Sequence, residues 1–551
     1  MKAASPPGAL PRPRRGPLTR VRVLSVIPLA VAALVSAGCA GSSPATPGPG
    51  SGSASGAAAG ATIPLLREGT TYTFSNLTEQ YADGLPEANW AEHLVRVGPD
   101  GQVQPWLAQS VTQSSPTVYT YHLRHGVEFW DGNEMTSADV VNALASDRVP
   151  SAYEATYFTD VASITAPDKY TVVVTLKRPD AGWGPVLATV GGIFEKKFQQ
   201  EHGASYGKPG VGIMDTGPEE IQSFDPTTGV ELTANPHYWG GPVPVKHISL
   251  KFFQDDTPLA LAMRAGEIDI AYPQSTTHFQ STCGCKVTSA PGDTSADVVM
   301  NVNMAPFSNI HVRRAIAYAI DRSAEVAESA DPSTPVTSNS VLTPGELGTL
   351  APKAQVTALL NSLPAYPFDL AKAKAELAES PYPHGFTTTA YTLDFGTYLP
   401  ETEVVAAQLA KIGINVQLKV MSLAAWVAKY DGPKTAGFWV ITNASGGFPD
   451  PARDAANMVD GVYAGAPGGN NLAGYNSPQV NALLAQADSI SDKAKRFALY
   501  GQVLKIVGND VPYVMLYTHT DDLALSAKFT WPDYYYESYT SPWLYYIRPG
   551  S

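Results

Sequence analysis

Cysteine is scarce in this chain of 551 residues, which excludes one common way of stabilising a secreted fold. Cys39, Cys283 and Cys285 are the only three cysteines. A disulfide framework of the kind found in small secreted domains needs more cysteines in a shorter chain. A chain of this length instead builds its own hydrophobic cores, and the length predicts two or three packed lobes.

Positive charge is also low. The chain has 37 basic and 50 acidic residues and a net charge of −13. Residues 1–38 carry six basic residues and no acidic one, so the rest of the chain carries −19. An acidic body argues against non-specific binding to nucleic acid or to an anionic membrane surface.

Long apolar runs are missing beyond residue 39, so the body is not expected to span a membrane. The N-terminus differs, because a basic stretch ending at Arg22 is followed by an apolar run of about 13 residues, 23–35. Ser36-Ala37-Gly38-Cys39 then resembles a bacterial lipobox, with Ser36 where a large aliphatic residue is usual. We expect residues 1–38 to be a signal peptide and Cys39 to carry a lipid. The alternative is an ordinary secretory signal with an incidental cysteine.

Residues 39–60 continue with AGSSPATPGPGSGSASGAAAG after the cysteine. Ser, Gly, Pro and Ala of this kind cannot build a core, so we expect a flexible tether. A lipid, a tether and a folded body together predict a protein held at the outer face of the cell membrane.

Motifs of known catalytic chemistry are absent. The chain has no HExxH, no GxSxG and no GxxxxGK[ST], and its ten histidines are scattered. Ser445 is a conceivable nucleophile, but its Gly-rich surroundings favour a loop. We expect no enzyme activity and no cofactor, with a secreted hydrolase as the least favoured hypothesis.

Cys283-Gly284-Cys285 leaves three interpretations open. The two thiols can form a disulfide, remain free or bind a soft metal ion. A metal site usually needs four ligands, and no second cysteine pair exists. We therefore expect no metal, and an oxidising compartment favours the disulfide.

Strands and helices alternate along the body, which predicts an α/β architecture. Period-two patterns predict strands at 171–176, 248–253 and 414–420, and helical spacing predicts helices at 312–320, 371–380, 403–412, 480–487 and 494–507. Residues 327–365 are rich in Ser, Thr and Pro, and we expect a long surface excursion there.

Several segments resemble the bacterial extracellular solute-binding proteins of family 5, which serve peptide and nickel importers. The most specific segment is 119–140, YTYHLRHGVEFWDGNEMTSADV, in which Asp131-Gly132 supplies a turn and Thr136 a helix cap. Others, in family order, are Gly98–Ser110, Asn235–Gly241, Gly266–Ala271, Val312–Arg322 and Phe448–Pro451. The matches extend from about residue 95 to about residue 515.

Two places depart from the family pattern. The family's Gly-Thr-Gly-Pro-Tyr is Asp215-Thr216-Gly217-Pro218-Glu219 here. Many peptide-binding members carry an aspartate before the aromatic residue of the late turn, where it pairs with the free amine of the peptide. This chain has Gly447 at that position.

The resemblance implies a two-lobed periplasmic-binding-protein-like fold of type II, in its three-domain form, with mixed sheets and a hinged cleft. It places the first lobe at 61–270 with an inserted subdomain at about 101–210, the second lobe at 271–518, and a return to the first lobe at 519–551. The lobes are expected to close around a ligand about strands near residues 271 and 518.

Cleft positions of the family supply the candidate ligand-binding residues. Both lobes contribute to the set: Tyr72, Phe74, Asn301, Asn303, Trp439, Asn443, Ser445 and Asp450. Aromatic side chains are more often core residues than ligand contacts, which is the alternative for each of them.

We therefore expect a monomeric, lipid-anchored receptor that passes a peptide or peptide-like solute to the permease of an ABC importer. The alternative within the class is a receptor for an oligosaccharide, an opine or a metal chelate. Neither hypothesis involves nucleic acid.

Overall fold

The computed structural model describes most of the chain beyond residue 61. The described residues are 62–80, 87–98, 101–149, 153–273, 276–329, 340–393, 398–432, 435–443, 450–464, 471–535 and 540–550. They all lie in one compact unit, Ala57–Ser551. Among the helices of these residues, none is long and apolar enough to cross a bilayer.

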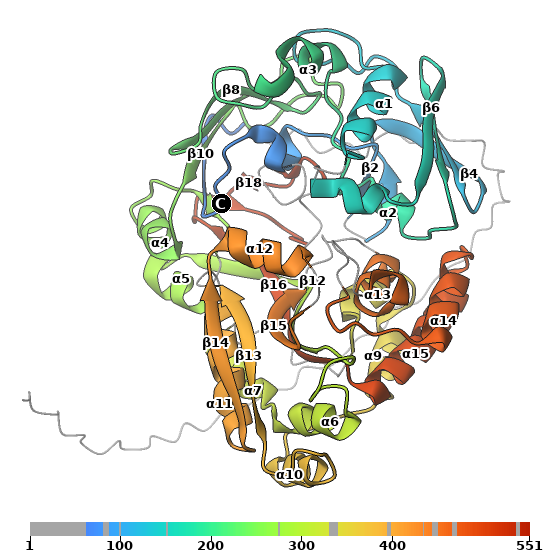
Figure 1. Ribbon diagram of the computed structural model, residues 1–551. Helices are drawn as coiled ribbons and strands as arrows, with labels where there is room; N and C mark the ends of the chain where they lie inside the picture. The colour runs from blue at the N-terminus through green and yellow to red at the C-terminus, as the bar shows by residue number, and fades with distance from the viewer. Residues whose placement is uncertain are drawn as a thin grey trace, which may run out of the picture. The chain divides into compact units, whose positions relative to one another are not determined.

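One ten-stranded mixed sheet extends through this unit (Figure 1). Its strand order is β14-β13-β15-β12-β16-β11-β1-β10-β9-β8. The strands are β1 Leu66–Thr70, β8 Glu219–Asp225, β9 Gly229–Ala234, β10 His247–Phe252, β11 Ile270–Ala271, β12 Lys286–Met300, β13 Phe386–Leu393, β14 Ile414–Met421, β15 Phe438–Asn443 and β16 Tyr513–Leu525.

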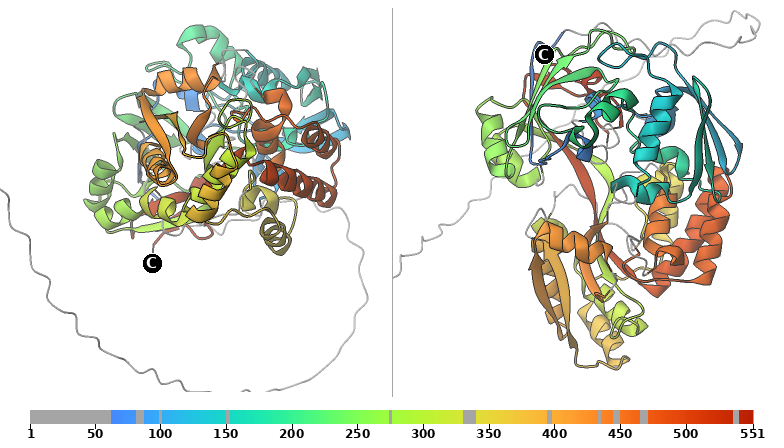
Figure 2. Two further views of the ribbon diagram at one scale, coloured as in Figure 1. Left: turned by 60° about the horizontal axis from the view of Figure 1, so that its bottom comes forward. Right: turned by 45° about the horizontal axis from the view of Figure 1, so that its top comes forward.

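Two long antiparallel strands, β12 and β16, connect the two halves of the sheet (Figure 2, right). Their register shifts between Pro291 and Ser295. On one side of the shift β16 pairs with β11, and on the other side β12 pairs with β15. We call residues 62–290 and 520–550 the first lobe and residues 295–518 the second lobe.

The first crossing between the lobes therefore comes later in the chain than residue 271. Before β12 begins, α4 (Asp256–Arg264) and α5 (Thr276–Cys283) pack together in a small cluster that includes Phe279, Ile268 and Ala524. This cluster covers the first-lobe end of β12 and β16, so the segment after residue 271 still belongs to the first lobe.

A second, antiparallel sheet lies within the first lobe, in the order β4-β5-β7-β6. Its strands are β4 Ala108–Ser115, β5 Val118–Leu123, β6 Val161–Asp168 and β7 Thr171–Leu176. Beside it lie α1 Ser137–Ser146, α2 Trp183–Val186 and α3 Lys196–His202. Two further pairs of short strands are β2 Val95–Val97 with β3 Val103–Pro105, and β17 Phe529–Thr530 with β18 Arg548–Pro549. One hydrophobic core joins this sheet to β1, β10 and the C-terminal residues Trp531 and Trp543.

Three of the family-like segments meet at the buried carboxylate of Glu92. Trp106 Nε1 and Tyr238 Oη donate to its Oε1 at 2.7 Å each, while Trp239 Nε1 and Thr216 Oγ1 donate to its Oε2 at 2.8 Å each. Burial raises the pKa of Glu92 despite these four hydrogen bonds. Four positions of the family-like segments therefore have one structural role in the first lobe, which is to donate hydrogen bonds to Glu92: Trp106, Thr216, Tyr238 and Trp239.

The second lobe has helices on both faces of its sheet. Around β13, β14 and β15 lie α6 Ile310–Ala319, α7 Arg322–Ser329, α8 Pro344–Gly348, α9 Lys353–Asn361, α10 Leu370–Ala378, α11 Tyr398–Ala410, α12 Leu423–Asp431, α13 Pro451–Val459, α14 Pro478–Asp488 and α15 Lys493–Asp510. Alternate residues of β15 enter different cores, because successive side chains of a strand point to opposite faces. Trp439 and Ile441 pack with α8, α9 and α12–α15, whereas Phe438 and Val440 pack with α6, α10 and α11.

Most of the expected elements are present. The three expected strands correspond to β7, β10 and β14, and the five expected helices correspond to α6, α10, α11, α14 and α15. Asn309 caps α6 by accepting from His311 N at 2.9 Å, and Thr136 caps α1 with Asp139.

The expectation of a surface excursion at 327–365 is wrong for residues 340–363, which the structure describes. Residues 340–363 contain α8 and α9, and within this range Val341, Leu342, Leu347 and Val356 are buried. Thr343 and Pro344 start α8 in a capping box with Glu346, so the Thr and Pro here begin a helix.

Candidate ligand-binding site between the lobes

Tyr72 follows β1 at the carboxyl end of a parallel strand pair and is 48% exposed. Its backbone N–H donates to Thr70 Oγ1 at 3.0 Å, which fixes the turn out of the strand. Ligands of open α/β sheets bind beyond such carboxyl ends. The position of Tyr72 is therefore consistent with its candidate role in the first lobe.

Tyr398 and Thr442 of the second lobe and His519 at the crossing lie near one another, and Tyr72 of the first lobe is close enough to Tyr398 to act on it electrostatically. Thr442 lies near the end of β15 and His519 lies in β16 at the crossing, with Thr442 Oγ1 and His519 Nε2 3.3 Å apart. Burial raises the pKa of Tyr398 to about 12, a hydrogen bond with Thr442 opposes this rise, and nearby Glu401 and Tyr72 add to it. We call Tyr72, Tyr398, Thr442 and His519 the crossing cluster.

The crossing cluster contains no carboxylate, amine or guanidinium group, and its one imidazole is uncharged. Burial lowers the pKa of His519 to about 4, so its imidazole carries no charge. Glu401 nearby accepts a hydrogen bond from Tyr517 Oη. The cluster can therefore donate and accept hydrogen bonds to a polar solute without adding a net charge of its own. Sequence reasoning missed Tyr398, Thr442 and His519, because no motif marks them and only the sheet order brings them together.

Phe74 is a core residue, which corrects its candidate role. Its side chain is 5% exposed, and its ring lies 5.4 Å from the ring of Phe224 and 4.9 Å from that of Phe252. These aromatic neighbours bury it inside the first lobe.

Asn301 and Asn303 lie at the wrong end of the second lobe for a cleft role. They follow β12 beyond Met300, whereas the crossing lies in the middle of that strand, before Ser295. Asn301 Oδ1 accepts from Asn303 N at 3.0 Å, and Asn303 Nδ2 donates to the carbonyl oxygen of Gly474 at 2.6 Å. Their amides satisfy local backbone groups.

Trp439 is also a core residue and not a wall of the cleft. Its side chain is 2% exposed, and its ring packs against those of Tyr391, Trp426 and Tyr430. The strand alternation described above turns it toward α12.

Asp450 lines the space between the lobes but is already paired. Arg496 Nη1 and Nη2 donate to its two oxygens at 2.7 and 2.5 Å, and its Oδ1 also caps α13 by accepting from Ala452 N at 2.9 Å. The backbone of Asn443 ends β15 opposite Ser295, beside the crossing. The side chain of Asn443, and all of Cys39, Ser445 and Gly447, lie outside the described residues.

A cavity of about 560 Å³ lies between the lobes near Asp450. Its walls come from both lobes and include Gln113, Tyr119 and Pro185 of the first and Leu350, Asp488 and Arg496 of the second. At its edge Lys493 Nζ donates to Gln102 Oε1 across the lobes. The described structure thus has the two lobes in contact, with a space left between them that polar and apolar side chains line together.

The comparison with known proteins agrees with this architecture. The profile of the bacterial extracellular solute-binding proteins, family 5 Middle, matches residues 102–466.

The chain belongs to this family.

A curated relative, the glutathione-binding protein GsiB of Escherichia coli K12, is 29% identical over 429 residues, which cover 74% of this chain and 79% of the relative.

Two solved structures share the fold over nearly the whole chain. DppA from Helicobacter pylori in complex with the peptide STSA has a TM-score of 0.72 at 23% identity and covers 89% of this chain and 99% of its own. AgaA of A. tumefaciens R10 in complex with agropinic acid has a TM-score of 0.73 at 22% identity and covers 88% of this chain and 99% of its own. The expected α/β binding-protein fold is confirmed.

Membership of family 5 fixes the class of function. Its members are substrate-binding proteins of ABC importers, which hold a solute outside the cytoplasm without transforming it. This chain is therefore an extracytoplasmic solute-binding protein and not an enzyme.

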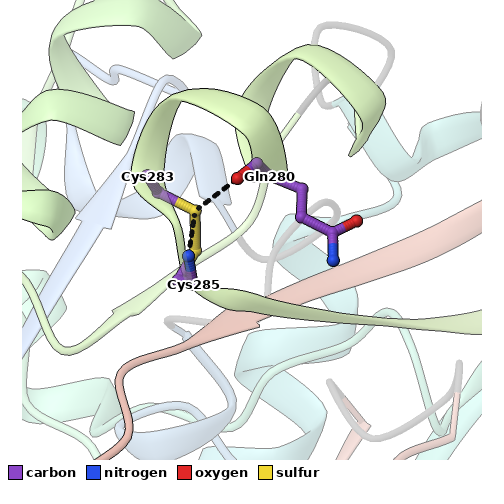
Figure 3. The surroundings of a disulfide bond; sticks show 3 residues. All are labelled: Gln280, Cys283 and Cys285. Carbon is purple, nitrogen blue, oxygen red and sulfur yellow. Dashed lines mark hydrogen bonds between the residues drawn. A yellow bond between two sulfur atoms is a disulfide. The ribbon is translucent and has the colours of Figure 1, made fainter.

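The chain has a disulfide between Cys283 and Cys285 (Figure 3). The two Cα atoms are 5.1 Å apart, and the bond closes the corner between α5 and β12. Of the three interpretations of this pair, the structure has the disulfide. In the part of the chain described here, no group of three or more His, Cys, Asp or Glu side chains is arranged to hold a metal ion.

Proposed function

We propose that this protein captures a peptide-like or similarly polar small solute between its two lobes and delivers it to the permease of an ABC importer. The observation that carries the proposal is the crossing cluster, in which Tyr72 of the first lobe is close enough to Tyr398 of the second to act on it electrostatically. A ligand held by groups from both lobes stabilises their contact, and this differential binding is what drives closure.

A peptide-like ligand is supported by the relatives. GsiB binds glutathione, and DppA holds a tetrapeptide. Peptides offer amide groups that hydroxyl and imidazole groups recognise through neutral hydrogen bonds. The crossing cluster supplies groups of that type.

An opine is the second candidate, because AgaA holds agropinic acid. Two features of this chain favour a ligand without a free α-amine. Position 447 is a glycine, which has no side chain, and Asp450 is committed to Arg496. Neither position offers a carboxylate to a terminal amine.

We further propose that the mature chain starts at Cys39 and is anchored through a lipid on that residue, with residues 40–60 as the tether. The support is the basic stretch, the short apolar run and the small residues before the cysteine. A single lipidated residue followed by a tether keeps a receptor close to its permease.

Mass spectrometry of gently purified protein tests both parts. Under native conditions we expect a mass excess from a bound solute, which denaturation releases unchanged for identification. The denatured chain should have the mass of residues 39–551 plus a diacylglycerol, and a Cys39→Ser variant should lack the lipid. A solute that the protein converts to a product, or an equal lipid content in the Cys39→Ser variant, would contradict the respective part.

A further inference from the structure

A buried ion pair crosses between the lobes away from the crossing cluster. Arg453 Nη2 lies 2.5 Å from Asp180 Oδ2, and the two side chains are 8% and 11% exposed. Asp180 lies between β7 and α2 of the first lobe, and Arg453 lies in the first turn of α13 of the second lobe. Arg453 Nη2 also reaches the carbonyl oxygen of Tyr157 at 3.5 Å.

Each partner is oriented by its own lobe. Asp180 Oδ1 accepts from Gly182 N at 2.9 Å, and the carbonyl oxygen of Asp180 accepts from Tyr119 Oη at 3.2 Å. Arg453 is held by α13, whose N-terminus is capped by Asp450. The ion pair therefore needs little rearrangement when the lobes meet, and both charges become solvated when the lobes separate.

The backbone on the two sides of the pair is in close approach. A Cβ atom added to Gly182 would lie 3.2 Å from Ala452 Cβ and 3.2 Å from Arg453 Cγ. A Cβ atom added to Gly184, two residues further along, would meet nothing within 4 Å. The contact surface between the lobes thus passes directly over Gly182.

We propose that Asp180 and Arg453 form an inter-lobe latch whose charge balance determines how readily the lobes close, without contacting the solute. This proposal rests on the lobe closure of the proposed function. An intact buried ion pair is close to neutral, because desolvation offsets the attraction, whereas removing one partner leaves a buried charge unpaired. The unpaired charge penalises only the closed arrangement, since water solvates it when the lobes are apart.

The latch sets the apparent affinity for any solute. The fraction of closed, binding-competent protein multiplies the intrinsic affinity, so a lower closed fraction weakens binding by the same factor. Asp180 and Arg453 are therefore positioning residues, and their effect should appear in closure itself.

Disulfide trapping measures closure without any solute. In a Cys39→Ser background, Gly182→Cys combined with Ala452→Cys places two thiols where the lobes meet, at a Cβ separation of 3.2 Å, slightly shorter than the roughly 3.5–4.5 Å of a disulfide. Gly184→Cys combined with Ala452→Cys is the matched control and should cross-link at least tenfold more slowly. The rate of cross-linking under mild oxidation then reports the closed population.

Adding Asp180→Asn should slow the trapping of the 182–452 pair at least tenfold, because Asn keeps the acceptor for Gly182 N but leaves Arg453 unpaired. Adding Arg453→Met to Asp180→Asn removes the unpaired charge and should restore the rate to within about threefold. Glu134→Gln breaks the exposed Lys169–Glu134 pair within the first lobe and should leave the rate unchanged.

Equal trapping rates with and without Asp180→Asn would overturn the latch while leaving solute binding and closure intact. If the Gly182→Cys/Ala452→Cys variant with Asp180 and Arg453 intact does not cross-link, both the latch and the closed arrangement of the lobes are overturned. Neither result depends on which solute binds, so the mass spectrometric test of the proposed function is judged separately.

Discussion

At the residue scale, the clearest lesson concerns Glu92, which no motif includes. Four donors from three sequence segments converge on it, two of them indole N–H groups. Sequence reasoning recognised the Trp and Tyr positions as family-like but could not explain them, because their shared acceptor is distant in the chain.

Glu92→Gln should lower the free energy of unfolding by about 1–3 kcal/mol. The glutamine amide can replace only one carboxylate oxygen as an acceptor, so in either orientation one of the indole groups of Trp106 and Trp239 faces another donor. Urea denaturation of the variant and the wild type measures the difference. A variant as stable as the wild type would show that the carboxylate is not needed.

Substitutions of Trp439 and Tyr398 distinguish a residue that packs in the core from a residue that binds the solute. Trp439→Ala removes a buried aromatic side chain and should cost about 3–5 kcal/mol of stability. Tyr398→Phe removes only a hydroxyl group at the crossing cluster and should weaken binding of the co-purified solute about tenfold with little loss of stability. Calorimetric titration and thermal unfolding of both variants check this. Unweakened binding in Tyr398→Phe would remove Tyr398 from the site.

The candidate residues show what sequence can and cannot provide at this scale. Tyr72 stays a candidate, because it follows a recognisable first strand and is exposed at its end. Phe74 and Trp439 were misplaced because an aromatic residue in a strand or at its end has the same pattern whether it faces a core or a cleft. Asn301 and Asn303 were misplaced because the direction of β12 relative to the crossing is not encoded locally.

At the element scale, strands and helices with clear periodicity were predicted well, as β7, β14 and α15 show. The segment of α8 and α9 was not, because Ser, Thr and Pro serve equally in loops and at helix starts. The sheet order, in which β12 and β16 join both lobes, depends on contacts between residues far apart in the chain and has no local signal.

The start of α8 offers a direct test of this segment. Thr343 Oγ1 accepts from Glu346 N at 3.3 Å, and Glu346 Oε2 accepts from Thr343 N at 2.6 Å. Thr343→Ala removes one half of this capping box and should destabilise the protein by about 1 kcal/mol. Thr349→Ala, past the end of the same helix, serves as a control with a smaller effect. Equal stability of Thr343→Ala and the wild type would favour the surface excursion instead.

At the scale of the whole molecule, the contact between the lobes contains charged groups that respond to pH. Burial raises the pKa of Asp488 to about 8, Asp180 and Asp450 add to this rise, and Arg496 and Arg453 oppose it. The inter-lobe cavity that Asp488 lines also includes Tyr119 and Lys493.

Asp488 should make the protein less stable as the pH rises. Its carboxyl has an ordinary pKa near 4 in the unfolded chain, so between about pH 4 and pH 8 the folded protein keeps a proton that the unfolded chain has lost. The contribution of this proton to the free energy of unfolding is fully present below about pH 4 and is lost as the pH rises toward 8. Asp488→Asn cannot ionise and should gain about 1–3 kcal/mol over the wild type between pH 5 and pH 8. Urea denaturation at several pH values measures this gain, and parallel pH profiles would contradict it.

The central claim is that a solute is enclosed between two lobes and released unchanged. Small-angle X-ray scattering of the protein, first stripped of its co-purified solute and then saturated with it, tests this claim most directly. We predict that the radius of gyration decreases on saturation and that the recovered solute is chemically identical to the one added. A radius of gyration that does not change at saturation, or a solute recovered in altered form, would contradict the account.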